Sequence, residues 1–398
     1  MTISEEAIEL REKNRGILET SLKMPVQDRH DLAVIYTPGV AEPCLRIKED
    51  PDLSFALTCR GNTVAVISDG TRVLGLGDIG PAAAIPVMEG KSAIYKKFGN
   101  IDAIPLVIDT KDPEEFIQTV RLLGKSFAGI NLEDISSPKC YDIEDRLKAE
   151  MDIPVFHDDQ HGTAIAALAG VLGGLRCTGK KIEDVKIVMN GAGAAGTAIA
   201  RLLLEAGARH LTILASKGIL YDNGRLNRVQ KELCQRINPD NHTGTFRDAV
   251  TRADVLIGCS APGAFRKEDM ALMADKNIVF AMANPVPEMM LPEAREAGIY
   301  IFGTGRSDMP NQINNSSVFP GLFRGALDVK ARQINEEMKL AAAYALADLL
   351  PEGELSPDHV VADVFDSRVP HAVARAVAAA AIRSGAARVS EMPLSYRD

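Results

Sequence analysis

Short apolar runs alternate along the chain with longer segments whose apolar residues recur at helical spacing. Eight runs rich in β-branched residues have the length of strands, at residues 64–68, 103–109, 127–131, 153–156, 211–214, 254–258, 278–281 and 299–302. A further apolar run, residues 185–190, precedes a glycine-rich turn and a long helical pattern. Strands that alternate with helices are typical of an α/β protein with largely parallel sheets.

The pattern places a domain boundary near residue 162. A helix rich in small residues, TAIAALAGVLGGL, is expected from residue 163 and leads toward the glycine-rich turn. We therefore expect an N-terminal α/β domain, residues 1–162, and a doubly wound (Rossmann-type) nucleotide-binding domain, residues 163–398, that ends in helices. Those last helices are rich in alanine, and this composition predicts that they pack within the chain or form contacts between subunits.

The glycine-rich turn carries the pattern of a dinucleotide site. Gly191-x-Gly193-x-x-Gly196 follows a predicted strand and opens a helix, which is the context that this fingerprint requires. The first glycine allows the tight turn, the second lets the backbone approach the pyrophosphate, and the third lets the helix pack on the strand. The expected binding segment comprises Gly191, Ala192, Gly193, Ala194, Ala195 and Gly196.

The end of the next strand indicates which nucleotide is bound. An NAD site usually has Asp or Glu there to hold the ribose 2′-hydroxyl, whereas this strand ends in Ala215-Ser216-Lys217. Ser216 can donate a hydrogen bond and Lys217 is cationic, so the pair suits a 2′-phosphate. The sequence therefore favours NADP over NAD.

Acidic residues follow two of the predicted strands. The segment NLED ends in Glu133 and Asp134, and FHDDQHG contains Asp158 and Asp159 between two histidines. Because ligands gather beyond the carboxyl ends of parallel strands, these carboxylates are expected at one crevice. A zinc-protease H-E-x-x-H site would need one helix through both histidines, and the preceding strand and Gly162 argue against it.

Composition and charge exclude several classes. With 46% hydrophobic residues and a net charge of −9, the chain is a folded protein without the basic clusters of nucleic-acid or acidic-membrane binders. The N-terminus is acidic, and no apolar run approaches the roughly 18 residues of a membrane span. Six cysteines lie apart without a C-x-x-C pair. We expect a cytoplasmic protein with reduced thiols.

Seven stretches of different character follow one another in order: YTPGVA (36–41), SDGTRVLGLGDIGP (68–81), PVMEGKSAIYKKFGNIDAIP (86–105), NLED (131–134), FHDDQHGTA (156–164), ANPVPE (283–288) and NQINNSSVFPG (311–321). Together they resemble the malic enzymes, specifically the short bacterial form. This resemblance implies oxidative decarboxylation of L-malate to pyruvate and carbon dioxide, with NADP or NAD and with Mg²⁺ or Mn²⁺. It also implies decarboxylation of oxaloacetate and a homodimer or larger homo-oligomer.

The resemblance assigns roles to the acidic residues. Glu133, Asp134 and Asp159 match the metal ligands of the family, and three hard oxygen ligands suit Mg²⁺ or Mn²⁺ rather than zinc. Because neighbouring side chains of an extended strand point to opposite sides, Asp158 is expected to do a different job. Asp158 matches the family aspartate that faces the catalytic lysine, and the histidines then shape the loop.

The same resemblance names the groups that act on the substrate. Lys91 matches the general base, which requires that its pKa be lowered from about 10.4. Tyr36 matches the acid that protonates C3 after carbon dioxide departs, and its structural alternative is a place in a Pro-Gly turn. Arg72 is expected to hold a malate carboxylate, with Asn284 and Asn315 contacting the substrate and Asn284 also the nucleotide.

Two other functions use the same residues. A malolactic enzyme would need the same metal, lysine and nucleotide. A nucleotide-sensing protein without catalysis would need only the glycine turn, and its retention of Tyr36, Lys91 and the three acidic ligands would be unexplained.

Overall fold

The computed structural model describes residues 2–396, which form two sheets joined by one long helix. The first sheet is parallel, in the order β2 (Asp102–Val107), β1 (Thr63–Ser68), β3 (Gly129–Leu132), β4 (Val155–His157). The second runs β10 (Ile301–Thr304), β9 (Ile278–Ala281), β8 (Val255–Gly258), β5 (Lys186–Asn190), β6 (His210–Ala215), β7 (Gly218–Ile219). Only β7 pairs antiparallel. The predicted α/β class with largely parallel sheets is confirmed.

Each sheet changes the direction of its strand order at one point. In the first sheet this point lies between β1 and β3, and in the second between β5 and β8. Loops diverge to opposite faces at such a point, which leaves a crevice beyond the carboxyl ends of the two strands. The segments after β1 and β3 carry Arg72, Glu133 and Asp134, and the glycine turn follows β5.

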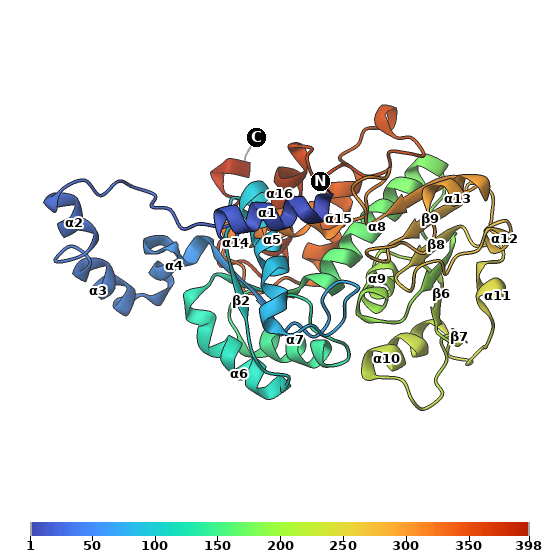
Figure 1. Ribbon diagram of the computed structural model, residues 1–398, viewed down its shortest axis with the longest axis horizontal. Helices are drawn as coiled ribbons and strands as arrows, with labels where there is room; N and C mark the ends of the chain where they lie inside the picture. Colours follow the sequence, from blue (N-terminus) through green and yellow to red (C-terminus); the bar gives the residue numbers. More distant parts are fainter. Residues whose placement is uncertain (1, 397–398) are drawn as a thin grey trace.

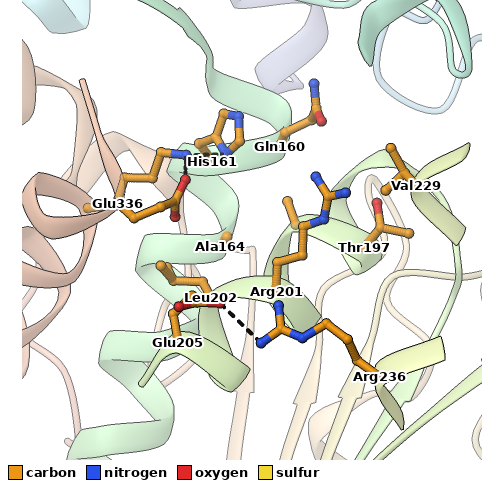
Figure 2. Close-up of a pocket in the computed structure, with 12 residues that line it drawn as sticks. Gln160, His161, Ala164, Thr197, Arg201, Leu202, Glu205, Val229, Arg236 and Glu336 are labelled. Atoms are coloured by element: carbon orange, nitrogen blue, oxygen red, sulfur yellow. Dashed lines mark hydrogen bonds and ion pairs between the residues drawn. The ribbon is translucent and has the colours of Figure 1, made fainter. Parts of the chain in front are cut away.

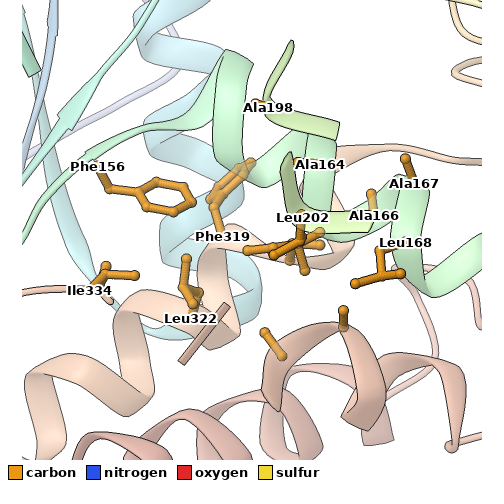
Figure 3. Close-up of a cluster of buried hydrophobic side chains, with 14 of the residues drawn as sticks. Phe156, Ala164, Ala166, Ala167, Leu168, Ala198, Leu202, Phe319, Leu322 and Ile334 are labelled. Carbon is orange, nitrogen blue, oxygen red and sulfur yellow. The ribbon is translucent and has the colours of Figure 1, made fainter. Parts of the chain in front are cut away.

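Helix α8 (Asp158–Thr178) connects the two sheets and is largely buried. Small side chains permit this, because a Cβ at Gly173 would lie 1.9 Å from the carbonyl oxygen of Val360. Figure 3 shows alanines of α8 packed with Leu202 of α9 (Ala194–Glu205) and with Phe319 and Leu322 of α14 (Phe319–Asp328). Residues of both sheets therefore share one apolar core.

The remaining helices cover the sheets or the C-terminal region. They are α5 (Pro81–Gly99), α6 (Pro113–Leu123), α7 (Lys139–Glu150), α10 (Arg228–Ile237), α11 (Phe246–Val250), α12 (Lys267–Met270), α13 (Leu291–Glu296), α15 (Glu336–Ala347) and α16 (Arg368–Arg383). The alanine-rich α15 and α16 bury alanines against α8 and α14, so these segments pack within the chain. No helix within residues 2–396 is long and apolar enough to cross a membrane.

The N-terminal helices are arranged differently. Helix α1 (Ile3–Asn14) lies against α5, where Arg11 Nη1 contacts Glu89 Oε2 at 2.5 Å. The following segment, residues 18–53, carries α2 (Arg29–Ile35) and α3 (Ala41–Glu49) and projects from the body (Figure 1, dark blue). We call it the arm. No residue of the arm is buried.

Two predictions about the region around residue 160 were wrong. The helix expected from residue 163 begins at Asp158, so Asp158 and Asp159 form its first turn rather than the end of a strand. Helix α8 also continues through Gly162. Acidic residues are favoured at a helix N-terminus by the helix dipole, which explains the early start.

Candidate active site

The loops at the carboxyl ends of both sheets enclose one cavity of about 880 Å³. Segments after β1, β3 and β4 form one wall, and segments after β5, β8 and β9 form the other. Eleven predicted site residues line it: Arg72, Lys91, Glu133, Asp134, Asp159, Gly193, Ala194, Ala195, Gly196, Asn284 and Asn315. The structure thus brings the acidic residues and the glycine turn to one space.

Lys91 is the central charged group of the first wall. It lies in the middle of α5, 8% exposed, with Nζ 2.8 Å from Glu133 Oε1 and hydrogen bonded to Asp158 Oδ2. The Phe319 ring centroid is 4.4 Å from Nζ. Burial alone would lower the pKa of Lys91, but the carboxylates of Asp158, Glu133 and Asp159 outweigh it and raise the pKa. In this arrangement Lys91 is a protonated ammonium.

Burial opposes the ionisation of the carboxyl groups beside Lys91. Burial and the charges of Asp159 and Glu133 raise the pKa of Asp134 to about 8. Burial also raises the pKa of Glu133 and of Asp159, and that of Asp158 to about 6. One ammonium therefore faces four acids whose ionisation is opposed by burial.

The three expected metal ligands, Glu133, Asp134 and Asp159, all line the cavity. Within the described residues, no group of three acidic, histidine or cysteine side chains is arranged to hold a metal ion. Asp159 Oδ2 accepts a hydrogen bond from the backbone N–H of Asp134 at 2.7 Å, and Lys91 neutralises Glu133. However, Asp134 Oδ2 is buried without a hydrogen-bond partner in the described chain. This orphaned oxygen, three hard oxygen donors and their raised pKa values fit a divalent cation.

The two histidines of FHDDQHG point to different places. His157 precedes the first turn of α8, fully buried, with its Nδ1 3.7 Å from Asp159 Oδ2. His161 Nε2 lies 2.9 Å from Glu144 Oε2, and its Nδ1 lies 3.1 Å from Lys339 Nζ. Burial lowers the pKa of both rings. They do not converge as zinc ligands, although the helix does run through Gly162.

His161 faces a second, smaller cavity of about 120 Å³ between α8, α9 and α10 (Figure 2). Its charged lining is already paired: Arg201 Nη2 lies 2.5 Å from Glu232 Oε2, and Arg236 Nη2 lies 3.1 Å from Glu205 Oε1. Lys339 is paired in the same way with Glu336, at 2.7 Å. This cavity has no free charge for a ligand among the side chains described, so the larger cavity is the candidate site.

The glycine turn has the close approaches that its pattern predicts. Gly191 has φ +127°, and a Cβ there would lie 2.4 Å from the carbonyl oxygen of Cys259. A Cβ at Gly196 would lie 1.9 Å from the carbonyl oxygen of Gly191, whereas one at Gly193 meets nothing within 4 Å. Gly193 precedes α9 without a side-chain cap, which leaves backbone N–H groups for a phosphate.

The other predicted nucleotide contacts, Ala192, Ser216 and Lys217, do not line the cavity. Ala192 is buried and accepts a hydrogen bond from Gln230 Nε2 at 2.8 Å. Ser216 and Lys217 form the exposed turn between β6 and β7, and neither lines the cavity. An adenosine ribose would have to extend past the glycine turn to reach them.

The predicted substrate contacts come from three separate loops. The backbone N–H of Arg72 donates to the carbonyl oxygen of Asp134 at 3.0 Å, which joins the loops after β1 and β3. Asn284 follows β9, and Asn315 begins a short 3₁₀ helix, Asn315–Ser317. All three residues line the cavity.

Tyr36 is the predicted proton donor, and the structure places it away from the cavity. It lies at the end of α2 in the arm, 67% exposed, and it does not line the cavity that the described residues form. Its backbone takes part in the turn, because the carbonyl oxygen of Tyr36 accepts a hydrogen bond from the N–H of Val40 at 2.8 Å, so the structural alternative of a tyrosine that caps a Pro-Gly turn stays open.

Sequence reasoning missed Glu288. This residue is fully buried, and its carboxylate accepts hydrogen bonds from the N–H groups of Ser260, at 2.7 Å, and Ala283, at 3.0 Å. Both donors line the cavity, so Glu288 joins the loops after β8 and β9. The sequence feature that could have identified Glu288 is its place as the last residue of the ANPVPE segment.

Two family models match the chain. The malic enzyme N-terminal domain matches residues 15–148, and the malic enzyme NAD-binding domain matches residues 160–307 and 299–382.

Individual relatives match along the same length. A bifunctional malic/malolactic enzyme of Bacillus subtilis is 51% identical over 99% of this chain and 96% of its own. An NAD-dependent malic enzyme of Geobacillus stearothermophilus is 53% identical over 95% of this chain and 79% of its own. An NADP-dependent malic enzyme of Escherichia coli is 45% identical, but the match covers 94% of this chain and 51% of that protein. A malic enzyme structure from Pyrococcus horikoshii has a TM-score of 0.92 at 45% identity, covering 98% and 92%.

Proposed function

This chain belongs to the malic enzyme family, and we propose that it converts L-malate to pyruvate and carbon dioxide while reducing NADP⁺ or NAD⁺. One observation supports this most directly. Lys91, Glu133 and Asp159 line the same 880 Å³ cavity as residues 193–196 of the glycine turn. A base and a nucleotide in one enclosed space are what oxidation of a small hydroxy acid requires.

The residues of the first wall would bind a divalent cation and activate the base. Glu133, Asp134 and Asp159 would hold Mg²⁺ or Mn²⁺, which when bound polarises the C2 oxygen and stabilises charge during loss of carbon dioxide. Their carboxylates would then no longer hold Lys91 in its protonated form, because a cation neutralises the charges that raise its pKa. Lys91 Nζ can accept the 2-hydroxyl proton, with Asp158 keeping it in position.

The remaining groups orient the substrate and complete the proton transfers. Arg72 binds a malate carboxylate in a charged hydrogen bond, and Asn284 and Asn315 contact the substrate from the nucleotide side. The glycine turn would hold NAD(P)⁺, which would supply the acceptor for the hydride of C2. We propose Tyr36 as the donor of the proton that C3 requires after decarboxylation, although the described chain holds its ring outside the cavity.

We propose NADP as the preferred nucleotide. Ser216 and Lys217 supply a hydrogen-bond donor and a positive charge at the end of β6, and position 215 holds an alanine rather than an acidic residue. Named relatives include both NAD- and NADP-dependent enzymes, so the end of β6 is the feature to test.

The experiment is a turnover assay with purified protein, L-malate and Mn²⁺ or Mg²⁺. We expect reduction of NADP⁺, formation of pyruvate and loss of activity on chelation. Failure to reduce either nucleotide would contradict the proposal. Lactate without net reduction would identify a malolactic activity instead, a second candidate that the bifunctional Bacillus subtilis relative favours.

A further inference from the structure

Glu144 of α7 is a buried carboxylate that no step of the proposed reaction uses; it is 3% exposed. Its Oε1 lies 3.1 Å from the backbone nitrogen of His157 and 2.6 Å from Lys148 Nζ. Its Oε2 lies 3.3 Å from Gln160 Nε2 and 2.9 Å from His161 Nε2. Three of these four partners belong to the start of α8 (Figure 2 shows two of them), the segment that carries both aspartates of the site.

Glu144 is ionised in this environment. Burial alone would raise the pKa of Glu144, but the hydrogen bond with His161 and the neighbouring cation of Lys148 hold it well below its usual value. Hydrogen bonds to an ionised acceptor are about twice as strong as those between neutral groups. The carboxylate therefore holds the start of α8 more firmly than a neutral side chain would.

The start of α8 depends on contacts from other helices, because its N-cap residue, His157, makes no side-chain cap hydrogen bond. The ring of His161 is held on its other side by Lys339 of α15, whose Nζ lies 3.1 Å from Nδ1. An ammonium group only donates, so Nδ1 accepts and Nε2 carries the proton that is donated to Glu144. The first turn of α8 is thus fixed between α7 and α15.

The first turn of α8 positions both aspartates. Asp158 is fully buried and hydrogen bonded to Lys91, and its side chain lies over Gly162, where a Cβ would be 1.8 Å from Asp158 Oδ1. Asp159 Oδ2 accepts the hydrogen bond from the backbone N–H of Asp134 at 2.7 Å. Successive residues of a helix are about 100° apart around its axis, so a rotation of this turn would move both carboxylates together.

Helix α7 has anchors of its own. It buries Cys140, Ile143 and Leu147 in the apolar core, and Tyr141 Oη lies 3.2 Å from Thr197 Oγ1 of α9. The helix that carries Glu144 is therefore a fixed base from which the start of α8 can be held.

We propose that Glu144 is a positioning residue for metal binding, which sets the rotation of the first turn of α8. This rotation directs Asp159 toward the cation and Asp158 toward Lys91. The inference rests on the proposed function, because it takes Asp159 as a metal ligand. A buried ion pair that served folding alone would contribute to stability without changing metal affinity, and this difference can be measured.

The test begins with Glu144→Gln in the full-length protein. Glutamine keeps the size of the side chain but has one acceptor oxygen, so one pair of donors would face an amide NH₂ group. We expect the Kd for Mn²⁺, titrated below the Tm by the electron paramagnetic resonance signal of the free ion, to rise about tenfold. The Kd for NADP⁺ should keep its wild-type value, because the four contacts of Glu144 all lie outside the glycine turn.

Glu144→Asp separates position from charge. It keeps the negative charge, but its side chain is one methylene shorter and cannot keep all the contacts with α8, so it should also weaken Mn²⁺ binding. It carries the test if Glu144→Gln does not fold. Lys148→Met is the matched control, because it removes the partner of Glu144 that is not on α8. It should lower the Tm, since Glu144 stays buried with one cation fewer, and leave the Kd for Mn²⁺ unchanged.

Each outcome bears on one claim. A folded Glu144→Gln or Glu144→Asp protein with the wild-type Kd for Mn²⁺ would overturn the inference. A Lys148→Met protein that loses Mn²⁺ affinity to the same extent would overturn it too, because a general loss of packing would then explain both variants. A wild-type protein that binds Mn²⁺ without oxidising malate would contradict the proposed function instead, and the comparison of Mn²⁺ affinities would still decide the role of Glu144.

Discussion

Two alanine substitutions in the glycine turn should separate folding from nucleotide binding. At Gly196 a Cβ would lie 1.9 Å from the backbone oxygen of Gly191, far inside contact distance, so β5 and α9 must move apart. Overpacking of this kind costs about 1–3 kcal/mol. At Gly193 a Cβ meets nothing within 4 Å and the φ of −81° suits alanine, so stability should change by less than about 0.5 kcal/mol.

The two variants are compared by thermal unfolding without nucleotide and by titration with NADP⁺. Gly196→Ala should lower Tm by about 1–4 °C, because an unfolding entropy of about 2.1 cal/mol/K per residue gives roughly 1 °C for each kcal/mol in a chain of 398 residues. Gly193→Ala should keep the wild-type Tm but weaken nucleotide binding by about tenfold or more, because the added methyl group occupies the space of the pyrophosphate. Wild-type affinity in Gly193→Ala would refute this account of the turn, and so would a wild-type Tm in Gly196→Ala.

Other predictions concern the acidic wall, the cofactor and pH. Lys91→Ala should abolish malate oxidation while the Kd for NADP⁺ stays unchanged in titrations. Asp159→Asn should lower the affinity for Mn²⁺ about tenfold, yet the metal-free protein should keep its Tm, because the substitution removes a charge that burial opposes. Ala215→Asp should shift kcat/KM toward NAD⁺, and a wild type that already strongly prefers NAD⁺ would contradict the proposed preference. Burial lowers the pKa of His161 from 6.5 to about 4, so the unfolded chain binds the proton more tightly. Wild-type stability should therefore fall between pH 6.5 and pH 4, by at most about 3 kcal/mol, and His161→Gln should flatten this dependence in denaturant titrations.

The parallel strands and the glycine turn could be predicted because their signals are local. Apolar runs bounded by turn residues located the parallel strands of both sheets to within a few residues, but not the short antiparallel β7. The spacing Gly191-x-Gly193-x-x-Gly196 implies a specific backbone geometry. The convergence of Glu133 and Asp159 followed from the general rule for carboxyl ends of parallel strands.

Local sequence signals predicted neither the start of α8 nor the environment of the buried charges. Asp158 and Asp159 follow an apolar run, so the sequence pattern predicted that the strand continues through them. In the structure the helix begins at Asp158, where the helix dipole and the packing of α8 favour it. The contact of Asp158 with Lys91 was predicted, but the opposite pointing of strand side chains was the wrong reason for it. Glu144 and Glu288 hold loops through hydrogen bonds across the fold, which no spacing reveals.

The placement of Tyr36 lay outside such reasoning for another physical reason. The chemistry of the YTPGVA segment follows from its residues, but the position of an exposed segment is set by what packs on it.

Helix α8 has a consequence for how substrate range can change. Its first turn holds Asp158 and Asp159, and Gly173, fifteen residues later, meets the backbone of Val360 with no room for a side chain. A helix rises about 1.5 Å and turns about 100° per residue, so the separation between these points is fixed by the residue count. Loop substitutions at the cavity mouth can alter which acid binds. Inserting one residue into α8 would instead rotate both carboxylates out of the site.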